Sequence, residues 1–307
     1  MVNHAASPAT SSNSTVVGSP NSSFWLFDAG NGFDLTHPPS PNSPLVAPRL
    51  KMQTATAPIT IAPHKTALVI IDMQNLFLRF ARGPGHDAEG ELLTRAIPAA
   101  RKAGIQIIYV TWGLSDEELS ILPPSVIRAF GFQESDGAEP GSGKECRRTA
   151  GAGDDLGDFE LPDGSTVSAG RLLMRGQWNT EIHGPLLQSF DESQQTALPD
   201  VRFHKARVSG FWAGSTACVD YLKQRGITTL LFGGVNTDQC VLASLQDACN
   251  LGFDTILLKD ACGTTSPKYA SDMVEYNCRK SWGFVSSCGA LAEGVRGMES
   301  PSCSANV

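Results

Sequence analysis

Hydrophobic residues along the chain alternate between short unbroken runs and sets that recur at helical spacing. The unbroken runs are typical of strands buried on both faces, and the spaced sets of helices that cover a sheet. The predicted strands are residues 66–72, 105–111, 201–205, 228–232, 254–260 and 283–287. The predicted helices include residues 87–102, 215–225, 240–251 and 266–282. Because strands and helices alternate, we expect a three-layer α/β/α fold with a doubly wound, mostly parallel six-stranded sheet.

The two ends of the chain differ in composition from this alternating part. Residues 1–23 are rich in Ser, Asn, Thr, Ala and Pro, which is typical of a disordered tail. Aromatic residues within 24–48 indicate an arm, either mobile or packed on the body or a neighbouring subunit. Residues 133–170 are long for a connection inside a domain and indicate a lid, a subunit contact or disorder. The predicted parts are a tail and arm at 1–60, a folded domain at 61–295 and a C-terminal tail at 296–307.

Candidate chemistry gathers at one edge of the predicted sheet. In open α/β sheets, ligands bind beyond the carboxyl ends of the strands. The residues predicted at those ends are Asp72, Trp112, Lys205 and Cys240. An acid, an ammonium group and a thiol are therefore expected to converge from three strands.

These three groups together fit nucleophilic catalysis by a thiol. Cys240 is predicted at the start of a helix, where the helix dipole and the Lys205 ammonium lower a thiol pKa. Asp72 could accept the thiol proton and pass it to a leaving amine. Backbone N–H groups of Asn236 and Cys240 could form an oxyanion hole. Taken singly, the residues also fit structural roles: a helix cap for Asp72, a solvated strand end for Lys205 and a buried small residue for Cys240.

Composition narrows the class of partner. The net charge is −7 without a basic run, so nucleic acid is not expected as a partner. No apolar run approaches the roughly 20 residues of a membrane span, and the chain opens without a secretory signal. The eight cysteines form no CxxC pair and no zinc-finger spacing. We therefore expect a cytoplasmic protein with free thiols, no membrane association and a small-molecule substrate.

Three ordered motifs resemble those of the isochorismatase-like cysteine hydrolase superfamily. They are DMQNLF at 72–77, HKARVSGF at 204–211 and GGVNTDQCV at 233–241. The resemblance covers roughly residues 60–290. It implies that Asp72, Lys205 and Cys240 are the catalytic acid, lysine and nucleophile. It also implies a cis peptide bond between Val235 and Asn236.

A softer match concerns RGQWNTEI at 175–182. This segment resembles the amidohydrolase branch that acts on carbamoyl or ureido amides, such as ureidoacrylate amidohydrolase, biuret hydrolase and N-carbamoylsarcosine amidase. The branch implies hydrolysis of a C–N bond through a thioester, without a cofactor, in a homo-oligomer (dimer or tetramer). Pocket walls are expected from Gln74, Trp112, Trp178, Phe211 and Asn236.

The sequence differs from two other branches of the superfamily, and these differences leave two alternatives open. The nicotinamidase branch builds a metal site from an Asp and histidines after the second strand, whereas VTWGLSDEEL at 110–119 has no histidine. We therefore predict no metal. Isochorismatases that cleave a vinyl ether lack the nucleophilic cysteine, so Cys240 favours an amidohydrolase. The alternatives left open are that vinyl-ether reaction with Cys240 incidental, and a non-catalytic binding protein on the same fold. A nucleotide-binding Rossmann protein is disfavoured, because DMQNLF stands where GxGxxG is expected.

Overall fold

The centre of the molecule is a six-stranded sheet in which every pairing is parallel. The computed structural model describes residues 14–80, 83–134 and 146–298. The strands run in the order β12-β7-β6-β13-β14-β15. Their bounds are β6 Thr66–Ile71, β7 Gln106–Trp112, β12 Val201–Lys205, β13 Thr229–Val235, β14 Asp254–Gly263 and β15 Phe284–Ser286. The predicted doubly wound sheet of six strands is confirmed.

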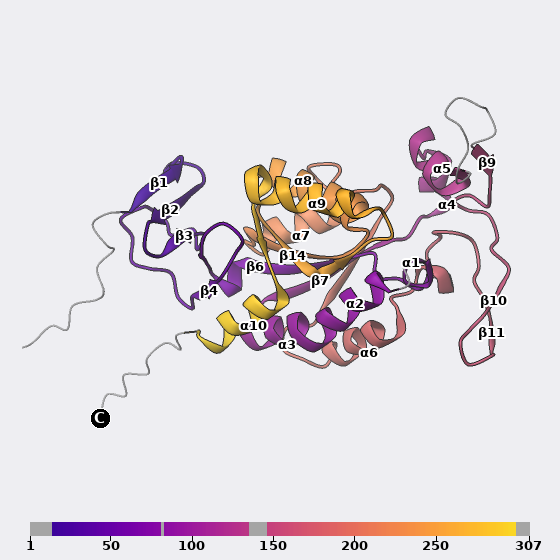
Figure 1. Cartoon of the computed structure of the whole chain (residues 1–307), viewed down its shortest axis with the longest axis horizontal. Helices are drawn as coiled ribbons and strands as arrows, with labels where there is room; N and C mark the ends of the chain where they lie inside the picture. Colours follow the sequence, from indigo (N-terminus) through magenta and orange to yellow (C-terminus); the bar gives the residue numbers. More distant parts are fainter. Residues whose placement is uncertain (1–13, 81–82, 135–145, 299–307) are drawn as a thin grey trace, which may run out of the picture.

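Helices cover both faces of this sheet and complete the three layers (Figure 1). One face carries α7 (Ala217–Gln224), α8 (Leu242–Asn250) and α9 (Lys268–Asn277). The other carries α2 (Pro84–Glu91), α3 (Ile97–Ala103), α6 (Gly184–Ser193) and α10 (Cys288–Arg296). All residues of β6, β7 and β13 are buried, which explains their unbroken apolar runs. Within the described ranges, no helix has the length and apolar character needed to cross a membrane.

Several predicted element boundaries differ from those of the structure. The strand expected to stop at Phe232 continues to Val235, because Gly233 and Gly234 stay paired with Ile70 and Ile71 of β6. Gly234 has φ +122°, and a Cβ there would meet the Ile71 carbonyl oxygen at 2.0 Å. Only glycine fits at that position. The helix predicted over 87–102 is divided into α2, a π-helical turn (η2, Leu92–Ala96) and α3.

The N-terminal region folds on the body instead of trailing from it. Strands β1 to β5 form a separate sheet in the order β1-β2-β3-β5-β4. Their bounds are β1 Thr15–Gly18, β2 Phe24–Asp28, β3 Gly32–Asp34, β4 Leu50–Met52 and β5 Ile59–Ile61. The tail predicted over residues 1–23 is therefore wrong for β1, because four of its residues pair with β2 despite their small, polar surroundings. Residues 1–13 lie outside the described ranges.

Partly buried contacts join this N-terminal sheet to the central one. The Trp25 indole N–H donates to Oδ1 of Asp254 at 2.7 Å, and the ring lies 5.5 Å from that of Phe284. Nε2 of His37 lies 2.7 Å from Oδ2 of the same carboxylate, whose side chain is 4% exposed. Asp254 begins β14 and Phe284 begins β15. The arm is thus packed on the body, one of the two arrangements that its aromatics indicated.

The connection between β7 and β12 forms a cover with a small apolar core of its own. Leu114, Leu122, Val126 and Leu172 are buried there against Trp112. The cover contains two short helices, two hairpins and a 3₁₀ turn. These are α4 Asp116–Ser120, α5 Pro124–Gly131, β8 Phe132–Glu134, β9 Cys146–Arg148, β10 Asp158–Glu160, β11 Thr166–Ser168 and η3 Trp178–Thr180. The predicted loose segment over 133–170 is therefore largely hairpin in its described part.

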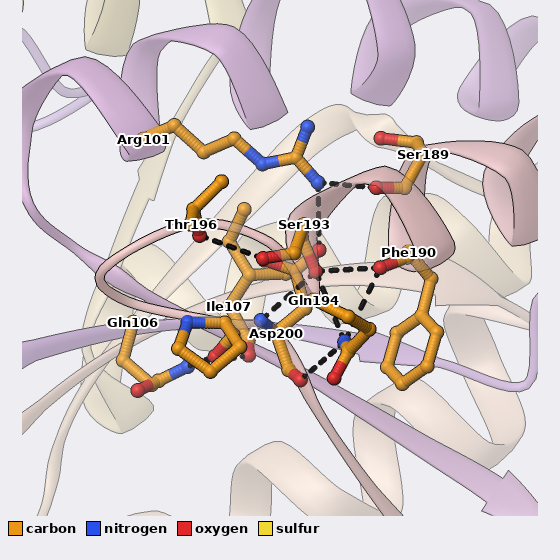
Figure 2. Close-up of polar contacts among 10 residues, drawn as sticks. Arg101, Gln106, Ile107, Ser189, Phe190, Ser193, Gln194, Thr196 and Asp200 are labelled. Carbon is orange, nitrogen blue, oxygen red and sulfur yellow. Dashed lines mark hydrogen bonds and ion pairs between the residues drawn. The ribbon is translucent and has the colours of Figure 1, made fainter.

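A polar network joins helices to the amino ends of β7 and β12 (Figure 2). Arg101 of α3 donates from Nη2 to Oδ2 of Asp200 at 2.8 Å and to the Ser189 carbonyl of α6 at 2.7 Å. Burial raises the pKa of Asp200, and the Arg101 contacts oppose that shift. The network lies at the amino ends of the strands, whereas the predicted site lies at their carboxyl ends. It holds α3 and α6 against the sheet.

Candidate active site

Four neighbouring strands bring the predicted site residues to one edge of the sheet. Asp72 directly follows β6, Trp112 ends β7 and Lys205 ends β12. Cys240 lies in a π-helical turn, η4 (Thr237–Val241), between β13 and α8. The strand order β12-β7-β6-β13 therefore places an ammonium, an indole, a carboxyl and a thiol side by side. The prediction that α8 begins at Cys240 is wrong: the π turn comes first, and Asn236 is its N-cap.

Lys205 connects the other two groups of the cluster. Its Nζ lies 3.0 Å from Oδ2 of Asp72 and 3.5 Å from Sγ of Cys240. The exposed fractions are 1% for Asp72, 3% for Lys205 and 7% for Cys240. We call these three residues the triad cluster. A buried ammonium group that contacts both a carboxyl group and a thiol can stabilise negative charge on either of them.

Backbone carbonyls hold the lysine in this place. Nζ of Lys205 also donates to the carbonyl oxygens of Arg207 at 3.1 Å and Val208 at 2.9 Å. The loop that supplies them is tied to α8, because the Gly210 N–H donates to Oγ of Ser244 at 3.0 Å. Nothing in the sequence distinguishes these carbonyls, so they could not have been predicted. They supply two further acceptors to the ammonium group.

Burial dominates the electrostatics of the site. It raises the pKa of the Cys240 thiol to about 12, although the Lys205 ammonium acts to lower it and the Asp72 charge acts to raise it. Burial also raises the pKa of Asp72, against the opposing effect of Lys205 and hydrogen bonding from Cys240. The predicted lowering of the thiol pKa is therefore correct for the contribution of Lys205 but wrong in total. The balance of these effects favours a protonated thiol in the resting site.

Asp72 is held by its backbone as well as by its charge. It has a left-handed φ of +52°, uncommon for a residue with a side chain. Its N–H donates to the Val110 carbonyl at 3.0 Å, and its Oδ1 accepts the Trp112 N–H at 3.1 Å. These contacts aim the carboxyl group at Lys205.

Gln74 supports the same backbone instead of lining a pocket. Its Oε1 accepts the Trp112 N–H at 2.9 Å, and its Nε2 donates to the carbonyls of Trp112 at 2.8 Å and Thr180 at 2.6 Å. The side chain is fully buried. Both amide N–H donors are used within the protein, so the interpretation of Gln74 as a pocket wall does not fit its position.

The aromatic candidates occupy three different environments. Trp112 is buried beneath Lys205, with its ring centroid 3.9 Å from Nζ. Its indole N–H has no hydrogen-bond partner in the part of the chain that the structure describes, although its nearness to Cys240 acts to lower the thiol pKa. Phe211 is a core residue, 5.9 Å from the Phe232 ring, and its place in a pocket wall stays a prediction. Trp178 does line a pocket, of about 590 Å³, together with Asn75 of α1 (Asn75–Phe80).

The turn before Cys240 has the backbone form that the resemblance implied. The peptide bond between Val235 and Asn236 is cis. The Asn236 carbonyl accepts the N–H groups of Gln239 at 3.0 Å and Val241 at 3.2 Å. Oδ1 of Asn236 is buried without a partner among the described residues. Its side chain therefore still offers an acceptor to a bound molecule.

Comparison with known proteins assigns the family. The model of the isochorismatase domain matches residues 66–276, more than half of the chain. The chain belongs to the isochorismatase family. The resemblance carried by the three motifs is thereby confirmed, and the protein is an isochorismatase-family hydrolase.

Relatives of this isochorismatase-family chain include two bacterial proteins named ureidoacrylate amidohydrolase RutB. The one from Agrobacterium fabrum is 29% identical over 248 residues, covering 77% of this chain and 94% of the relative. The one from Caulobacter vibrioides strain NA1000 is 28% identical and covers 81% and 93%. An isochorismatase family protein from Desulfovibrio vulgaris shares the fold, with a TM-score of 0.50 and 22% identity over 76% of this chain and 98% of the other.

Proposed function

We propose that this isochorismatase-family hydrolase cleaves a C–N bond of a small amide, ureido or carbamoyl substrate, with Cys240 as the nucleophile. The observation that carries the proposal is the buried Lys205 Nζ, 3.0 Å from Asp72 and 3.5 Å from Cys240. An acid, a lysine and a thiol in mutual contact are suited to acyl transfer. The names of the relatives from Agrobacterium and Caulobacter support the substrate class.

In the first half of the reaction, sulfur forms a bond to the substrate carbonyl carbon. The thiol proton passes to Asp72, which the raised pKa of that carboxyl favours. The Lys205 ammonium stabilises the negative charge that develops on sulfur. Backbone N–H groups of Asn236 and Cys240 hold the oxyanion. The C–N bond then breaks, Asp72 returns its proton to the leaving nitrogen, and ammonia or an amine departs.

In the second half, water cleaves the resulting thioester. Asp72 is again ionised and removes a proton from the attacking water. The sulfur leaves as the thiol, which restores the resting site. Every proton in the cycle moves through Asp72, and no cofactor takes part.

We also propose which residues line the substrate pocket and in which assembly the protein acts. We assign Trp178 and the Asn236 side chain to the substrate pocket, because Trp178 lines a pocket and Asn236 keeps a buried unpartnered oxygen. We further propose a cytoplasmic homo-oligomer, a dimer or tetramer. The exposed row Tyr269, Met273 and Tyr276 on α9 is a surface suited to a second copy. Light scattering coupled to size exclusion measures that state.

The test is ammonia release from a panel of small amides and ureido compounds, with Cys240→Ala beside the unmutated chain. We expect release to fall by about 10⁴-fold or more in the variant. Cys249→Ala is the matched control, because Cys249 is a free, half-buried cysteine on α8. Acid quenching during turnover should trap an acyl adduct on Cys240, detected by mass spectrometry. Ammonia release that survives Cys240→Ala contradicts Cys240 as the nucleophile. Silence without an adduct favours the vinyl-ether reaction or a binding protein.

A further inference from the structure

A second cluster of functional side chains lies outside the triad cluster. His86 and Glu89 are one turn apart on α2, and His183 is the N-cap residue of α6. Each offers a ligand atom, and these atoms all lie within 4.8 Å of one another. His183 is 94 residues from Glu89 in the chain, so the fold creates this cluster.

The main chain next to Asp72 fixes His183 in this cluster. The His183 N–H donates to the Met73 carbonyl at 2.9 Å. An isolated β-bridge also pairs Gln74 with Ile182. The segment that carries His183 is thus anchored to the residues that follow Asp72. Its ring has a defined position and does not depend on a free loop.

Glu89 brings the two imidazole rings to a common point. Its Oε1 lies 2.6 Å from Nδ1 of His183, and its Oε2 lies 3.3 Å from Nδ1 of His86. Both contacts are made through Nδ1, so the two rings present the same atom to one carboxyl group. The ring centroids are 5.3 Å apart. Two nitrogens and a carboxyl group therefore converge on one point, where a cation could lie.

Burial protects the carboxylate and leaves the histidines accessible. The Glu89 side chain is 7% exposed, whereas those of His86 and His183 are 45% and 27% exposed. Both histidines line the same 590 Å³ pocket as Trp178. Arg79 of that pocket donates to the Glu160 carbonyl at 3.1 Å, and its guanidinium lies 4.3 Å from the Phe159 ring centroid. These contacts hold the guanidinium against the β10 strand.

We propose that His86, Glu89 and His183 bind a transition-metal dication such as Zn²⁺ or Co²⁺. Two imidazoles and one carboxylate suit these ions, whereas Ca²⁺ and Mg²⁺ prefer oxygen ligands. The three residues are not part of the triad cluster, although they line the same pocket as Trp178, which we assign to the substrate. Metal binding itself does not depend on the proposed hydrolysis. This proposal departs from the prediction that the protein holds no metal, which rested on the absence of histidine from the segment 110–119.

Metal titration of the full, metal-free chain tests the proposal. Thiolates also bind Zn²⁺, so the Cys240→Ala chain is the background. We expect one Co²⁺ per chain, with a visible spectrum of nitrogen and oxygen ligation and no thiolate charge-transfer band. Zn²⁺ measured by calorimetry should compete for the same site. A spectrum with a thiolate charge-transfer band overturns the proposal, and so does a titration in which one Co²⁺ per chain is not bound.

Substitutions locate the ion. His86→Gln and His183→Gln should each weaken Zn²⁺ binding by at least about tenfold. His64→Gln is the matched control, because His64 is an exposed histidine on η1 (Pro63–Lys65), outside the cluster. Equal weakening in all three variants, or none in the first two, contradicts the assignment.

A measurement without substitution covers the case in which a variant does not fold. Carbethoxylation of the unmutated chain, mapped by mass spectrometry, should be slowed by Zn²⁺ at His86 and His183 but not at His64. Equal modification with and without Zn²⁺ excludes the site. Because neither assay measures hydrolysis, the outcome is distinguishable from that of the proposed function.

Discussion

The ammonium group of Lys205 lies 3.9 Å from the centroid of the Trp112 ring, and both side chains are buried. A cation over an indole face is stabilised by about 2 kcal/mol or more when water is excluded. Trp112 thus supports the charge that faces Asp72 and Cys240.

Substitutions at Trp112 separate the ring face from the indole N–H. We expect Trp112→Leu to lower kcat/KM by roughly 10- to 30-fold, because about 2 kcal/mol of cation stabilisation is lost. Trp112→Phe keeps a ring beneath Lys205 and should lose less. Steady-state kinetics, with thermal unfolding as the check on folding, measures both. An identical loss in the two variants contradicts the role of the ring.

Asp72 and Lys205 act in opposite directions on the thiol, and alkylation can show this. The Asp72 charge raises the Cys240 pKa and the Lys205 charge lowers it. At a fixed mildly alkaline pH, Asp72→Asn should therefore speed alkylation of Cys240, and Lys205→Met should slow it. Both variants should lose about 10³-fold or more in turnover. Iodoacetamide labelling read by mass spectrometry gives the rates, with Cys249 as an internal reference in each digest. Shifts in the same direction contradict this arrangement of charges.

The pH profile of kcat/KM reports which groups are protonated in the resting enzyme. Attack by a neutral thiol needs an ionised Asp72, whose pKa is raised above 3.8 by burial. Activity should therefore fall as pH decreases, with a midpoint above that value. No loss is expected on the alkaline side until the pH approaches the thiol pKa of about 12. A rise with a midpoint near 8.5, the ordinary value for a thiol, contradicts this protonation scheme.

The Arg101–Asp200 pair in Figure 2 predicts a stability effect that depends on pH. Arg101→Met leaves the buried Asp200 charge unpaired, which costs about 3–5 kcal/mol in the free energy of unfolding at neutral pH. Burial raises the pKa of Asp200 in the folded state. The stability gained from protonating Asp200 is fully present at a pH below its pKa in the unfolded state. It is lost as the pH rises through its pKa in the folded state. The variant should therefore lose less at pH 5 than at pH 7 in urea titrations.

A second substitution provides the control for this pair. Arg101→Met combined with Asp200→Asn removes the charge and should recover part of the loss at pH 7. A single variant whose loss is independent of pH, or a double variant as unstable as the single one, contradicts the role of the charge.

The sequence predicts the positions of Asp72 and of the turn before Cys240 because unbroken apolar runs mark the strands that lead into them. Lys205 is predicted from the end of the short strand VRFHK. The sequence does not predict where a side chain near the strand ends points. Gln74 and Phe211 follow the same motifs, yet one supports the backbone and the other fills the core.

Long-range contacts set the properties that sequence patterns miss. The thiol pKa depends on burial, which local helix and charge arguments cannot supply. The Glu89–His183 contact joins residues 94 positions apart. Strand β1 has too few apolar residues to be distinguished from a tail, and only its pairing with β2 reveals it.

The contact between Trp25 and Asp254 shows that the fold of this chain includes residues that precede the part matched by the family. The family model begins at residue 66, but a chain cut there leaves the Asp254 carboxylate without its indole donor and uncovers Phe284. Such a shortened protein would expose an apolar surface at the start of β15, and it would aggregate more readily. For this member of the family, the smallest unit worth expressing starts before β1.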